Sequence, residues 1–348
     1  MRRVLHLVGS PTDEFFAELS RLYARDCLEN TADPERYAFE VAHVSPDGRW
    51  RFPASLDAGA LAAAPAMPLA AAVTHLSSLG VDVVVPQMFC VAGMTHYRAL
   101  FDVLGIPYVG NTPDVMALGA HKARARAVVA AAGVNVPRGE LVRPGERPSV
   151  EPPAVVKPVD ADNSLAVALV RDRADFDRAV RDACAHAEAA LVETYVELGR
   201  EVRCGVVVQD STLVCLPLEE YALDPDRTPI RGYDDKLGRD DAGDLRLRAK
   251  DGIRSWIVDV DDPVTERVWA AARACHTALG CRHYSLFDFR IDPDGRPWFL
   301  EAGLYCSFAR QSVVAVMARA AGIDLDRLFG AAVEQALAGQ SRPDRPTR

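Results

Sequence analysis

The chain has 348 residues, of which 49% are hydrophobic and 26% charged, and its formal net charge is −9 at pH 7. This composition indicates an ordinary globular protein with a large core and excludes a chain that is disordered throughout. The negative charge argues against a nucleic-acid partner, which would need a basic face. No apolar run reaches the roughly 18 residues that cross a bilayer, and the eight cysteines form no CxxC pair. We therefore expect a soluble cytoplasmic protein.

The first third of the chain alternates strand and helix patterns. Short apolar runs predict strands over Val4–Val8, Phe39–Val44, Val81–Val85 and Ile106–Val109. Amphipathic or Ala-rich stretches between them predict helices over 13–28, 69–79 and 96–104. Strands separated by helices of this length are typical of a parallel sheet. We assign residues 1–115 to an N-terminal α/β domain.

Two further units follow. A helix over Asp114–Ala132 leads into strands at Ala154–Pro158, Ala190–Tyr195 and Val202–Val208, with a helix over Asp172–Ala187 between them. We expect residues 116–205 to form a small α+β domain and residues 206–338 a C-terminal domain, with a frayed tail at 339–348. The polar stretch 224–262 lacks clear periodicity and predicts either a lid over the site or a solvated excursion.

Two carboxylates are expected to face each other in the C-terminal domain. Asp294-Gly295 stands between two strand-like runs and predicts a hairpin with a two-residue turn. That turn places Asp288 directly opposite Glu301, which is costly unless a cation lies between them. Oxygen ligands without His or Cys favour Mg²⁺. The alternative is a register shifted by one residue, which would leave one acid in solvent.

The lysines are few enough to be informative. The 40 basic residues comprise 36 arginines and four lysines, namely Lys122, Lys157, Lys236 and Lys250. A lysine retained in such a chain indicates a place where a compact ammonium is needed, although codon bias alone is an equal alternative. Lys157 ends an apolar strand and precedes a small polar loop, which is compatible with phosphate binding. Arg290 would share a face with Asp288 and reach either a phosphate or a neighbouring acid.

These residues, in this order, resemble the D-alanine–D-alanine ligase-like branch of the ATP-grasp superfamily along nearly the whole chain. The resemblance implies an ATP-grasp fold, an ATP-dependent ligase with ATP and Mg²⁺, and commonly a homodimer. In that family, Lys122, Lys157 and Lys236 in Tyr-Asp-Asp-Lys match phosphate-contacting lysines. Other ATP contacts correspond to the hinge Glu193 to Val196, including Tyr195, and to the ribose-binding Glu201. The metal ligands correspond to Asp288 and Glu301, and a substrate serine to Ser312.

The chain departs from the family at three places. The flexible loop Gly-Ser-Ser-x-Gly is replaced by Asp162-Asn163-Ser164-Leu165-Ala166, which retains only Ser164 as a catalytic candidate. The third metal ligand, usually Asn, is replaced by Gly303, and the arginine that stabilises the oxyanion by Leu286. ATP handling therefore looks preserved, whereas D-alanyl peptide chemistry looks altered.

A narrower resemblance accommodates these departures. Segments around Leu5–Ser10, Pro86–Cys90, Gly93–Tyr97, Asp162–Ser164 and Glu301–Phe308 are similar to the mycosporine-like amino acid ligases. That resemblance implies condensation of serine, threonine or glycine onto the ring carbonyl of mycosporine-glycine, through a phosphorylated intermediate. It adds Ser307 and His96 as substrate contacts. The alternatives are a D-alanine–D-alanine or other dipeptide ligase, and a nucleotide-binding protein without catalysis.

Overall fold

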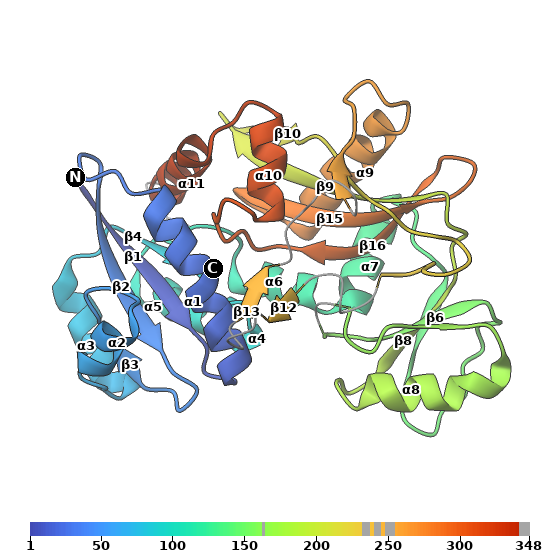
Figure 1. The fold of residues 1–348 in the computed structure, drawn as a ribbon, viewed down its shortest axis with the longest axis horizontal. Helices are drawn as coiled ribbons and strands as arrows, with labels where there is room; N and C mark the ends of the chain where they lie inside the picture. The colour runs from blue at the N-terminus through green and yellow to red at the C-terminus, as the bar shows by residue number, and fades with distance from the viewer. Residues whose placement is uncertain (162–163, 232–236, 240–244, 248–254, 341–348) are drawn as a thin grey trace, which may run out of the picture.

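The computed structural model describes residues 1–161, 164–231, 237–239, 245–247 and 255–340, and only the backbone of 237–239, 245–247 and 340. Three sheets carry the fold, and a short hairpin, β12 (Leu237–Arg239) with β13 (Leu245–Leu247), forms a fourth. Figure 1 shows the N-terminal sheet at one end of the molecule and the small sheet, which contains β6 and β8, at the other. Strands β9, β15 and β16 lie between them. The predicted α/β architecture is confirmed.

The N-terminal sheet has the order β3-β2-β1-β4, and β1 pairs in parallel with both β2 and β4. Leu5 and Leu7 on one face of β1 cluster with α3 and α5, whereas Val4 on the other face clusters with α11. The predicted strand 106–109 is reduced to one bridge between Val84 and Tyr108. The elements are β1 (Arg2–Gly9), α1 (Glu14–Asn30), β2 (Tyr37–Val44), β3 (Trp50–Arg51), α2 (Ala58–Ala63), α3 (Leu69–Leu79), β4 (Val83–Pro86), α4 (Val91–Met94) and α5 (His96–Leu104).

Local signals in the sequence set the ends of these helices. The Asp13 carboxylate accepts a hydrogen bond from the Phe16 backbone N–H at 2.8 Å and so caps α1. Gly80 ends α3 in the left-handed region, with φ of 61°, which glycine adopts without strain. The predicted helices 69–79 and 96–104 are confirmed with those bounds.

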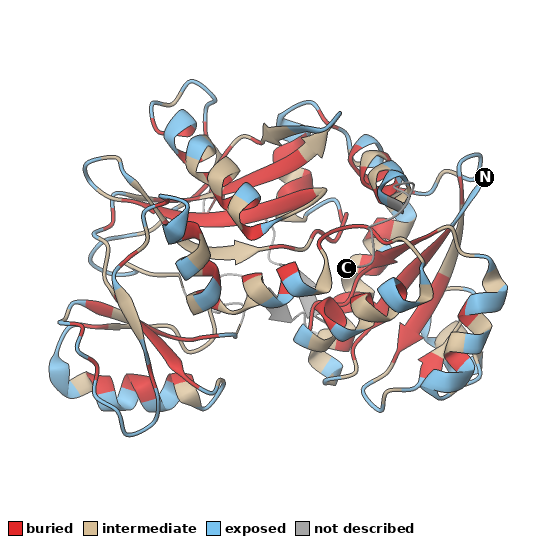
Figure 2. Ribbon diagram, turned by 180° about the vertical axis from the view of Figure 1, so that it is seen from behind, coloured by how far each residue is buried: buried red, intermediate tan, exposed pale blue. Residues whose placement is uncertain are grey.

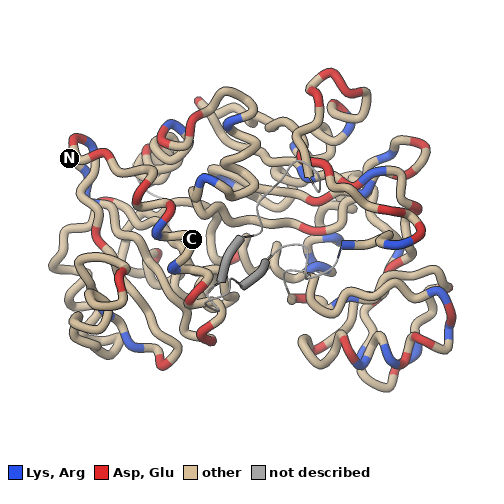
Figure 3. The backbone as a smooth tube through the Cα atoms, in the orientation of Figure 1, with Lys and Arg blue, Asp and Glu red and all other residues tan. Residues whose placement is uncertain are grey.

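The small sheet has the order β5-β8-β6-β7 and its strand pairs are antiparallel. The helix α8 packs on it through Phe176, Val180 and Ala183, and acidic and basic residues both occur along that helix (Figure 3). The helix predicted over 172–187 is shorter than expected, because a 3₁₀ turn precedes it. The elements are β5 (Gly139–Val142), β6 (Ala154–Pro158), β7 (Ala168–Val170), η1 (Arg173–Asp175), α8 (Phe176–Cys184) and β8 (Ala190–Thr194).

The six-stranded sheet runs β14-β11-β9-β15-β16, and β10 pairs with β9. Figure 2 shows its central strands buried along most of their length. The predicted domain boundary at 205/206 falls inside β9, so β9 belongs structurally with the C-terminal strands. The elements are β9 (Arg200–Gln209), β10 (Thr212–Cys215), β11 (Glu219–Tyr221), β14 (Ser255–Ile257), α9 (Thr265–Leu279), β15 (Tyr284–Ile291), β16 (Pro297–Gly303), α10 (Val313–Ala320) and α11 (Leu325–Gln340).

The connection into the small sheet is made by two helices, where the sequence predicts one. α6 (Pro113–Ala120) and α7 (Lys122–Ala131) are separated at His121, whose backbone is extended with ψ of 95°. The Lys122 N–H consequently donates to Val159 O at 2.8 Å, across to the small sheet. This break places Lys122 at the start of α7. In the part of the chain that the structure describes, no helix is both long and apolar enough to span a bilayer.

Candidate active site

One face of the six-stranded sheet carries the charged residues and the other carries core. Along β9 and β15 the buried apolar residues alternate with the charged ones, because successive side chains of a strand point to opposite faces. Val202, Cys204, Phe287 and Phe289 pack into a core cluster with α7 and α9. The residues between them, Glu201, Arg203, Asp288 and Arg290, therefore share the opposite face.

The predicted pairing of Asp288 with Glu301 is confirmed, but the predicted turn is wrong. The loop is one residue longer than expected: Gly295, with φ of 77°, donates its N–H to Asp292 O at 2.9 Å. This geometry is typical of a three-residue hairpin loop with glycine in the left-handed position. The longer loop by itself would shift the pairing of β15 with β16 by one residue. An irregularity between Asp288 and Phe289 shifts the pairing back. The two deviations cancel and bring the carboxylates face to face.

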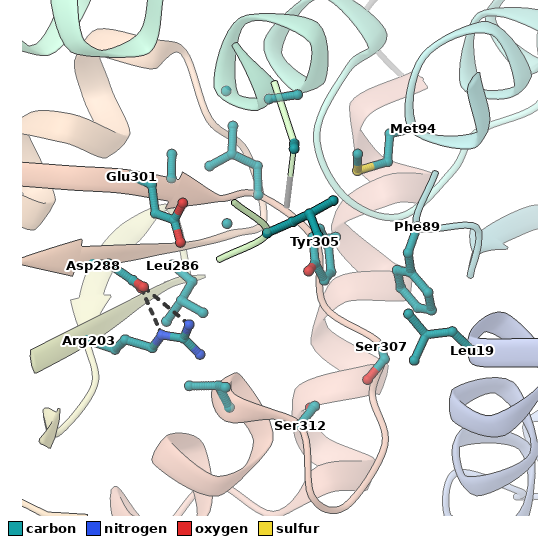
Figure 4. Close-up of a pocket in the computed structure, with 18 of the residues that line it drawn as sticks. Leu19, Phe89, Met94, Arg203, Leu286, Asp288, Glu301, Tyr305, Ser307 and Ser312 are labelled. Atoms are coloured by element: carbon teal, nitrogen blue, oxygen red, sulfur yellow. Dashed lines mark hydrogen bonds and ion pairs between the residues drawn. The ribbon is translucent and has the colours of Figure 1, made fainter. Parts of the chain in front are cut away.

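Four ionisable residues, three of them carboxylates, form one row across the sheet, which we call the carboxylate row. Glu219 on β11 pairs with Arg203 on β9, Arg203 with Asp288 on β15, and Asp288 with Glu301 on β16. The Arg203 guanidinium reaches both oxygens of Asp288, with Nε–Oδ1 at 2.8 Å and Nη2–Oδ2 at 3.1 Å (Figure 4). Arg231 lies 3.6 Å from the same Oδ2. Burial opposes the charge of Arg203, but Asp288, Tyr221 and Glu219 outweigh it and raise the pKa of the guanidinium.

Lys122 approaches the carboxylate row from the start of α7. Its Nζ donates to the carbonyl oxygen of Ala161, in the loop of the small sheet, and lies 3.9 Å from Glu301 Oε2. The side chain is buried. The lysine therefore links the small sheet to Glu301, one of the two predicted metal ligands. A bound phosphate would compete with Glu301 for its ammonium group.

Lys157 lies deeper, at the end of β6. Its Nζ is 2.6 Å from Glu193 Oε2 and 3.4 Å from Leu300 O. Arg126 lies 3.4 Å from the other Glu193 oxygen. Both predicted ATP-contacting residues thus face each other in one buried ion pair, in which Lys157 holds the Glu193 carboxylate.

Glu201 and Arg290 form a second buried ion pair, at 2.5 Å. Of the two partners that the sequence left open for Arg290, the structure shows the acid. Arg290 also donates to Val196 O at 3.3 Å and lies over the Tyr195 ring at 5.4 Å. The segment predicted to bind the nucleotide is therefore held against β15 by this arginine.

Two neighbouring cavities meet at the carboxylate row. The smaller, about 90 Å³, is lined by Lys157, Ser164, Glu193, Tyr195, Val196, Glu201 and Arg290. The larger, about 1130 Å³, is lined by Arg203, Leu286, Gly303, Ser307 and Ser312. Both are lined by Lys122, Ala161, Leu165, Arg231, Asp288 and Glu301. The predicted metal ligands thus lie at the boundary between the predicted nucleotide and substrate regions.

The far wall of the large cavity was not foreseen. Apolar side chains from α1, from the loop after β4 and from the segment after β16 meet there: Phe15, Phe16, Leu19, Tyr23, Phe89 and Tyr305. Phe89 lies 5.3 Å, between ring centres, from both Tyr23 and Tyr305. The apolar face of α1 was visible in the sequence, but its partners lie far away along the chain. Figure 4 shows Phe89, Leu19 and Met94 facing the carboxylates across this cavity.

Three predicted site residues need separate comment. His96 is exposed on the first turn of α5 and lines neither cavity, so its position argues against the predicted substrate contact. Ser164 lines the small cavity with φ of 57°, a left-handed backbone. Lys236 lies outside the described residues, as do the loop residues 162–163.

The donor set fits a divalent cation of the magnesium type. Among the residues that the structure describes, no group of three or more His, Cys, Asp or Glu side chains could hold a metal by itself. Magnesium, however, is commonly bound by one or two carboxylates together with phosphate oxygens and water. Asp288 and Glu301 supply two such carboxylates at the boundary of the cavities. Burial raises the pKa of the Cys306 thiol to about 12, which keeps this nearby cysteine protonated.

Comparison with known proteins decides the family. Residues 145–334 match the family described as D-ala D-ala ligase C-terminus. The chain belongs to the D-alanine–D-alanine ligase family. It is 29% identical to a D-alanine–D-alanine ligase of Mycolicibacterium smegmatis, over 97% of this chain and 95% of that protein. A D-alanine–D-alanine ligase of Desulfovibrio desulfuricans is also 29% identical, over 69% of this chain and 74% of the relative. The protein is accordingly an ATP-dependent carbon–nitrogen ligase.

Solved structures confirm the ATP-grasp fold of this ligase family. The VanG D-Ala:D-Ser ligase from Enterococcus faecalis superposes with a TM-score of 0.77 at 20% identity, covering 96% of this chain and 99% of its own. The D-alanine–D-alanine ligase from Bacillus anthracis complexed with ATP superposes with a TM-score of 0.72 at 17% identity, covering 98% of this chain and 99% of its own. At this identity the likeness concerns the fold.

Proposed function

We propose that the protein uses ATP to phosphorylate an oxygen of one substrate and then joins the amine of an amino acid to the carbon that carries this oxygen, as a dipeptide ligase of its family does. The observation that carries this proposal is the opposed pair Asp288 and Glu301 at the boundary between the two cavities. Lys122 and Lys157 beside that pair supply positive charge for phosphates. We assign the small cavity to ATP and the large cavity to the two other substrates.

Binding of ATP on this side requires the small sheet to move. A cavity of about 90 Å³ is too small for a whole nucleotide, since small-molecule pockets are typically about 300–1,000 Å³. The contacts that would have to lengthen are those between the small sheet and the six-stranded sheet. Lys157 to Leu300 O, at 3.4 Å, is one of them. Glu193, Tyr195, Val196 and Glu201 would then line the nucleotide.

The chemistry has two steps. In the first, the substrate oxygen bonds to the γ-phosphorus while the bond from that phosphorus to ADP breaks, and ADP leaves with the bonding electron pair. Lys122 and Lys157 neutralise the phosphate charge, and Ser164 lies in the loop that faces these phosphates. In the second, the amine nitrogen bonds to the activated carbon, the carbon–oxygen bond to phosphate breaks, and the nitrogen loses one proton. Asp288 and Glu301 would hold Mg²⁺, which supplies further charge neutralisation when bound.

A second candidate is ligation of serine, threonine or glycine to mycosporine-glycine, giving an imine-linked product. Two observations favour it. The position of the oxyanion arginine is taken by Leu286, which pairs across the sheet with Gly205 on one side and Gly303 on the other. The cavity beside it, about 1130 Å³ with an apolar aromatic wall, is far larger than D-alanine needs. A ring substrate and an amino acid would both have room in that space.

We also propose that the segment 224–262 acts as a lid; residues 232–236, 240–244 and 248–254 of it lie outside the described residues. We propose in addition that the protein works in the cytoplasm. Strand β13 of this segment contacts α1, on the other side of the large cavity. Pro229 and Arg231, at the start of the segment, lie against Arg290 and Asp288. A lid in this place would exclude water from the phosphorylated intermediate.

The test is a substrate panel with ATP and Mg²⁺. One set of reactions contains D-alanine, and the other mycosporine-glycine with serine, threonine or glycine; ADP, product mass and ultraviolet absorbance are measured. Dipeptide formation would establish the first function, and a product with absorbance at longer wavelength the second. Glu301→Gln serves as the inactive control. Absence of ADP and of product in every reaction would refute both.

A further inference from the structure

Arg203 contacts Asp288, one of the two predicted metal ligands, so metal binding would disturb this contact. It stands directly opposite Asp288, and its side chain is only 13% exposed. Nε and Nη2 contact the two oxygens of Asp288 at 2.8 and 3.1 Å. An arginine that touches both carboxylate oxygens occupies the same atoms that a cation would need. A divalent ion and the guanidinium cannot both keep full contact with Asp288.

Displaced from Asp288, the guanidinium would still be held at the same place in the sheet. Glu219 is its cross-strand neighbour on the other side, and Tyr221 lies 5.4 Å from it. Arg231 stacks on the same Tyr221 ring at 3.6 Å, which keeps a second cation close by. Tyr221 in turn donates to Glu219 at 2.7 Å. The guanidinium of Arg203 thus lies beside the Tyr221 ring, with Glu219 on the neighbouring strand, and has these partners when Asp288 binds a cation.

The large cavity has no arginine at the position where the family resemblance places the oxyanion arginine. Leu286 stands at that position on β15, and Arg203 is its diagonal neighbour on β9, on the same face of the sheet. Diagonal neighbours across antiparallel strands are roughly 7–8 Å apart, a distance that an arginine side chain can span. Arg203 lines the large cavity, as Leu286 does.

We propose that Arg203 exchanges partners during the reaction and supplies the positive charge that Leu286 cannot. In the empty site it neutralises Asp288. When a divalent cation and ATP occupy the site, the cation takes Asp288, and Arg203 turns to the oxygen that accepts the phosphoryl group and to the phosphate that later leaves. The exchange of partners keeps the buried site close to charge balance throughout. This inference rests on the proposed ligase function and adds a catalytic residue to it.

The proposal predicts opposite effects of one variant on metal binding and on catalysis. Mn²⁺ binding to the full-length protein, measured without nucleotide by electron paramagnetic resonance, should be at least tenfold tighter in Arg203→Gln, because the nearer of the two guanidinium groups at Asp288 is gone. With ATP, Mg²⁺ and substrates, the same variant should lose about 10²–10³-fold in kcat, as removal of one oxyanion donor does. The KM for ATP should change little. Arg203→Lys, which keeps a charge without the fork, should recover part of kcat.

Arg200→Gln is the matched control. Arg200 lies on the same strand and is ion-paired to Glu220 and Asp262, but it lines neither cavity. Thermal melting of each variant shows whether it is folded. Unchanged or weaker Mn²⁺ binding in folded Arg203→Gln would overturn the partner exchange, and an unchanged kcat would overturn the catalytic role. The Mn²⁺ titration needs no turnover, so it is decided separately from a failure of the wild-type protein to use any substrate.

Discussion

The small cavity and the large cavity, the two ends of one cleft, are lined by different kinds of residue. At the small cavity, buried charged residues are paired with one another: Lys157 with Glu193 at 2.6 Å, and Arg290 with Glu201 at 2.5 Å. At the large cavity, the wall facing the carboxylates is apolar and aromatic, with Phe89 between Tyr23 and Tyr305. The first end keeps the lysines and glutamates that the resemblance assigns to ATP but departs from it in the loop 162–166, whereas the second departs from it at Leu286 and Gly303.

The difference agrees with the ligand that we propose for each end. Phosphates and ribose are the same for every ATP-dependent ligase, and their recognition needs charges at defined places. Removing one partner of a buried ion pair leaves an uncompensated charge, which typically costs about 3–5 kcal/mol. An apolar wall can change shape by substitution at lower cost, because its residues need only fill space. We therefore expect substitutions to be tolerated better at the proposed substrate end than among the charges of the proposed nucleotide end.

The largest effect is expected at the boundary between the two ends. Asp288→Asn or Glu301→Gln should lower turnover by about 10³-fold or more, because the metal and its ligands neutralise the transferring phosphoryl group. Glu266→Gln is the control, since this exposed acid is paired with Arg273 on α9 and lines neither cavity. Steady-state ADP release at saturating Mg²⁺ measures the effect. Near-normal turnover in either carboxylate variant would show that the pair is not the metal site.

The next effect distinguishes a compact ammonium from any positive charge at the nucleotide end. Lys157→Arg and Lys157→Ala should both lower kcat/KM for ATP by about 100-fold, because a planar fork does not fit a place shaped for an ammonium. The buried contact between Nζ and Glu193 leaves little room for a larger group. Nucleotide titrations and initial rates measure it. Wild-type values in Lys157→Arg would mean that the rarity of lysine reflects codon usage only.

A smaller effect is expected at the substrate end, and on a different constant. Phe89→Ala should raise KM for the substrate that is phosphorylated by about 10–100-fold, since contact with a phenyl ring is worth about 1.5–3 kcal/mol. The KM for ATP should stay the same. Phe52→Ala, in the N-terminal domain and away from both cavities, is the control. Equal changes in both KM values would contradict the division of the cleft into two ends.

The last effect concerns the stability of the fold that supports both ends, and it is measured by unfolding and not by turnover. Burial lowers the pKa of His276, which is hydrogen-bonded to Ser285 at 2.8 Å, to about 4, and that of His43 also to about 4. Below pH 6.5 the unfolded chain protonates these histidines and the folded chain does not. Stability should therefore be full above pH 6.5 and fall as the pH decreases toward 4, by up to about 1.4 kcal/mol per pH unit for each histidine.

Urea midpoints at pH 7 and pH 5 measure this loss of stability. His276→Asn, which removes one titrating group, should show a smaller change between the two pH values than the wild type. A midpoint that does not fall between pH 7 and pH 5 would contradict the assignment of neutral buried histidines.

Much of the frame could be predicted from sequence because its signals are local. The helix bounds 69–79 and 96–104 follow from periodicity and from glycine at the helix ends. The opposition of Asp288 and Glu301 was predicted as well, although through a turn of the wrong length. The exposed position of His96 could not be predicted, since a sequence segment near a motif does not show which side of a helix faces the site.

Arg203 and the aromatic wall show what needed the assembled structure. The alternation of Glu201, Val202, Arg203 and Cys204 places Arg203 on the face of Glu201, but nothing in it shows that β9 lies beside β15 with Arg203 against Asp288. The wall joins residues 15–23, 89 and 305, which come from α1, the loop after β4 and the segment after β16 and meet only in the folded chain.

The sequence by itself determined the types and the spacing of the charged residues, the order of the elements and the family. These depend on interactions within a few residues or on motifs that can be read along the chain. The tertiary structure decided which charges pair, how large each cavity is and which residues face it. Pairing and cavity shape depend on strand order and on contacts between distant segments, and a period of two or of 3.6 residues carries no information about either.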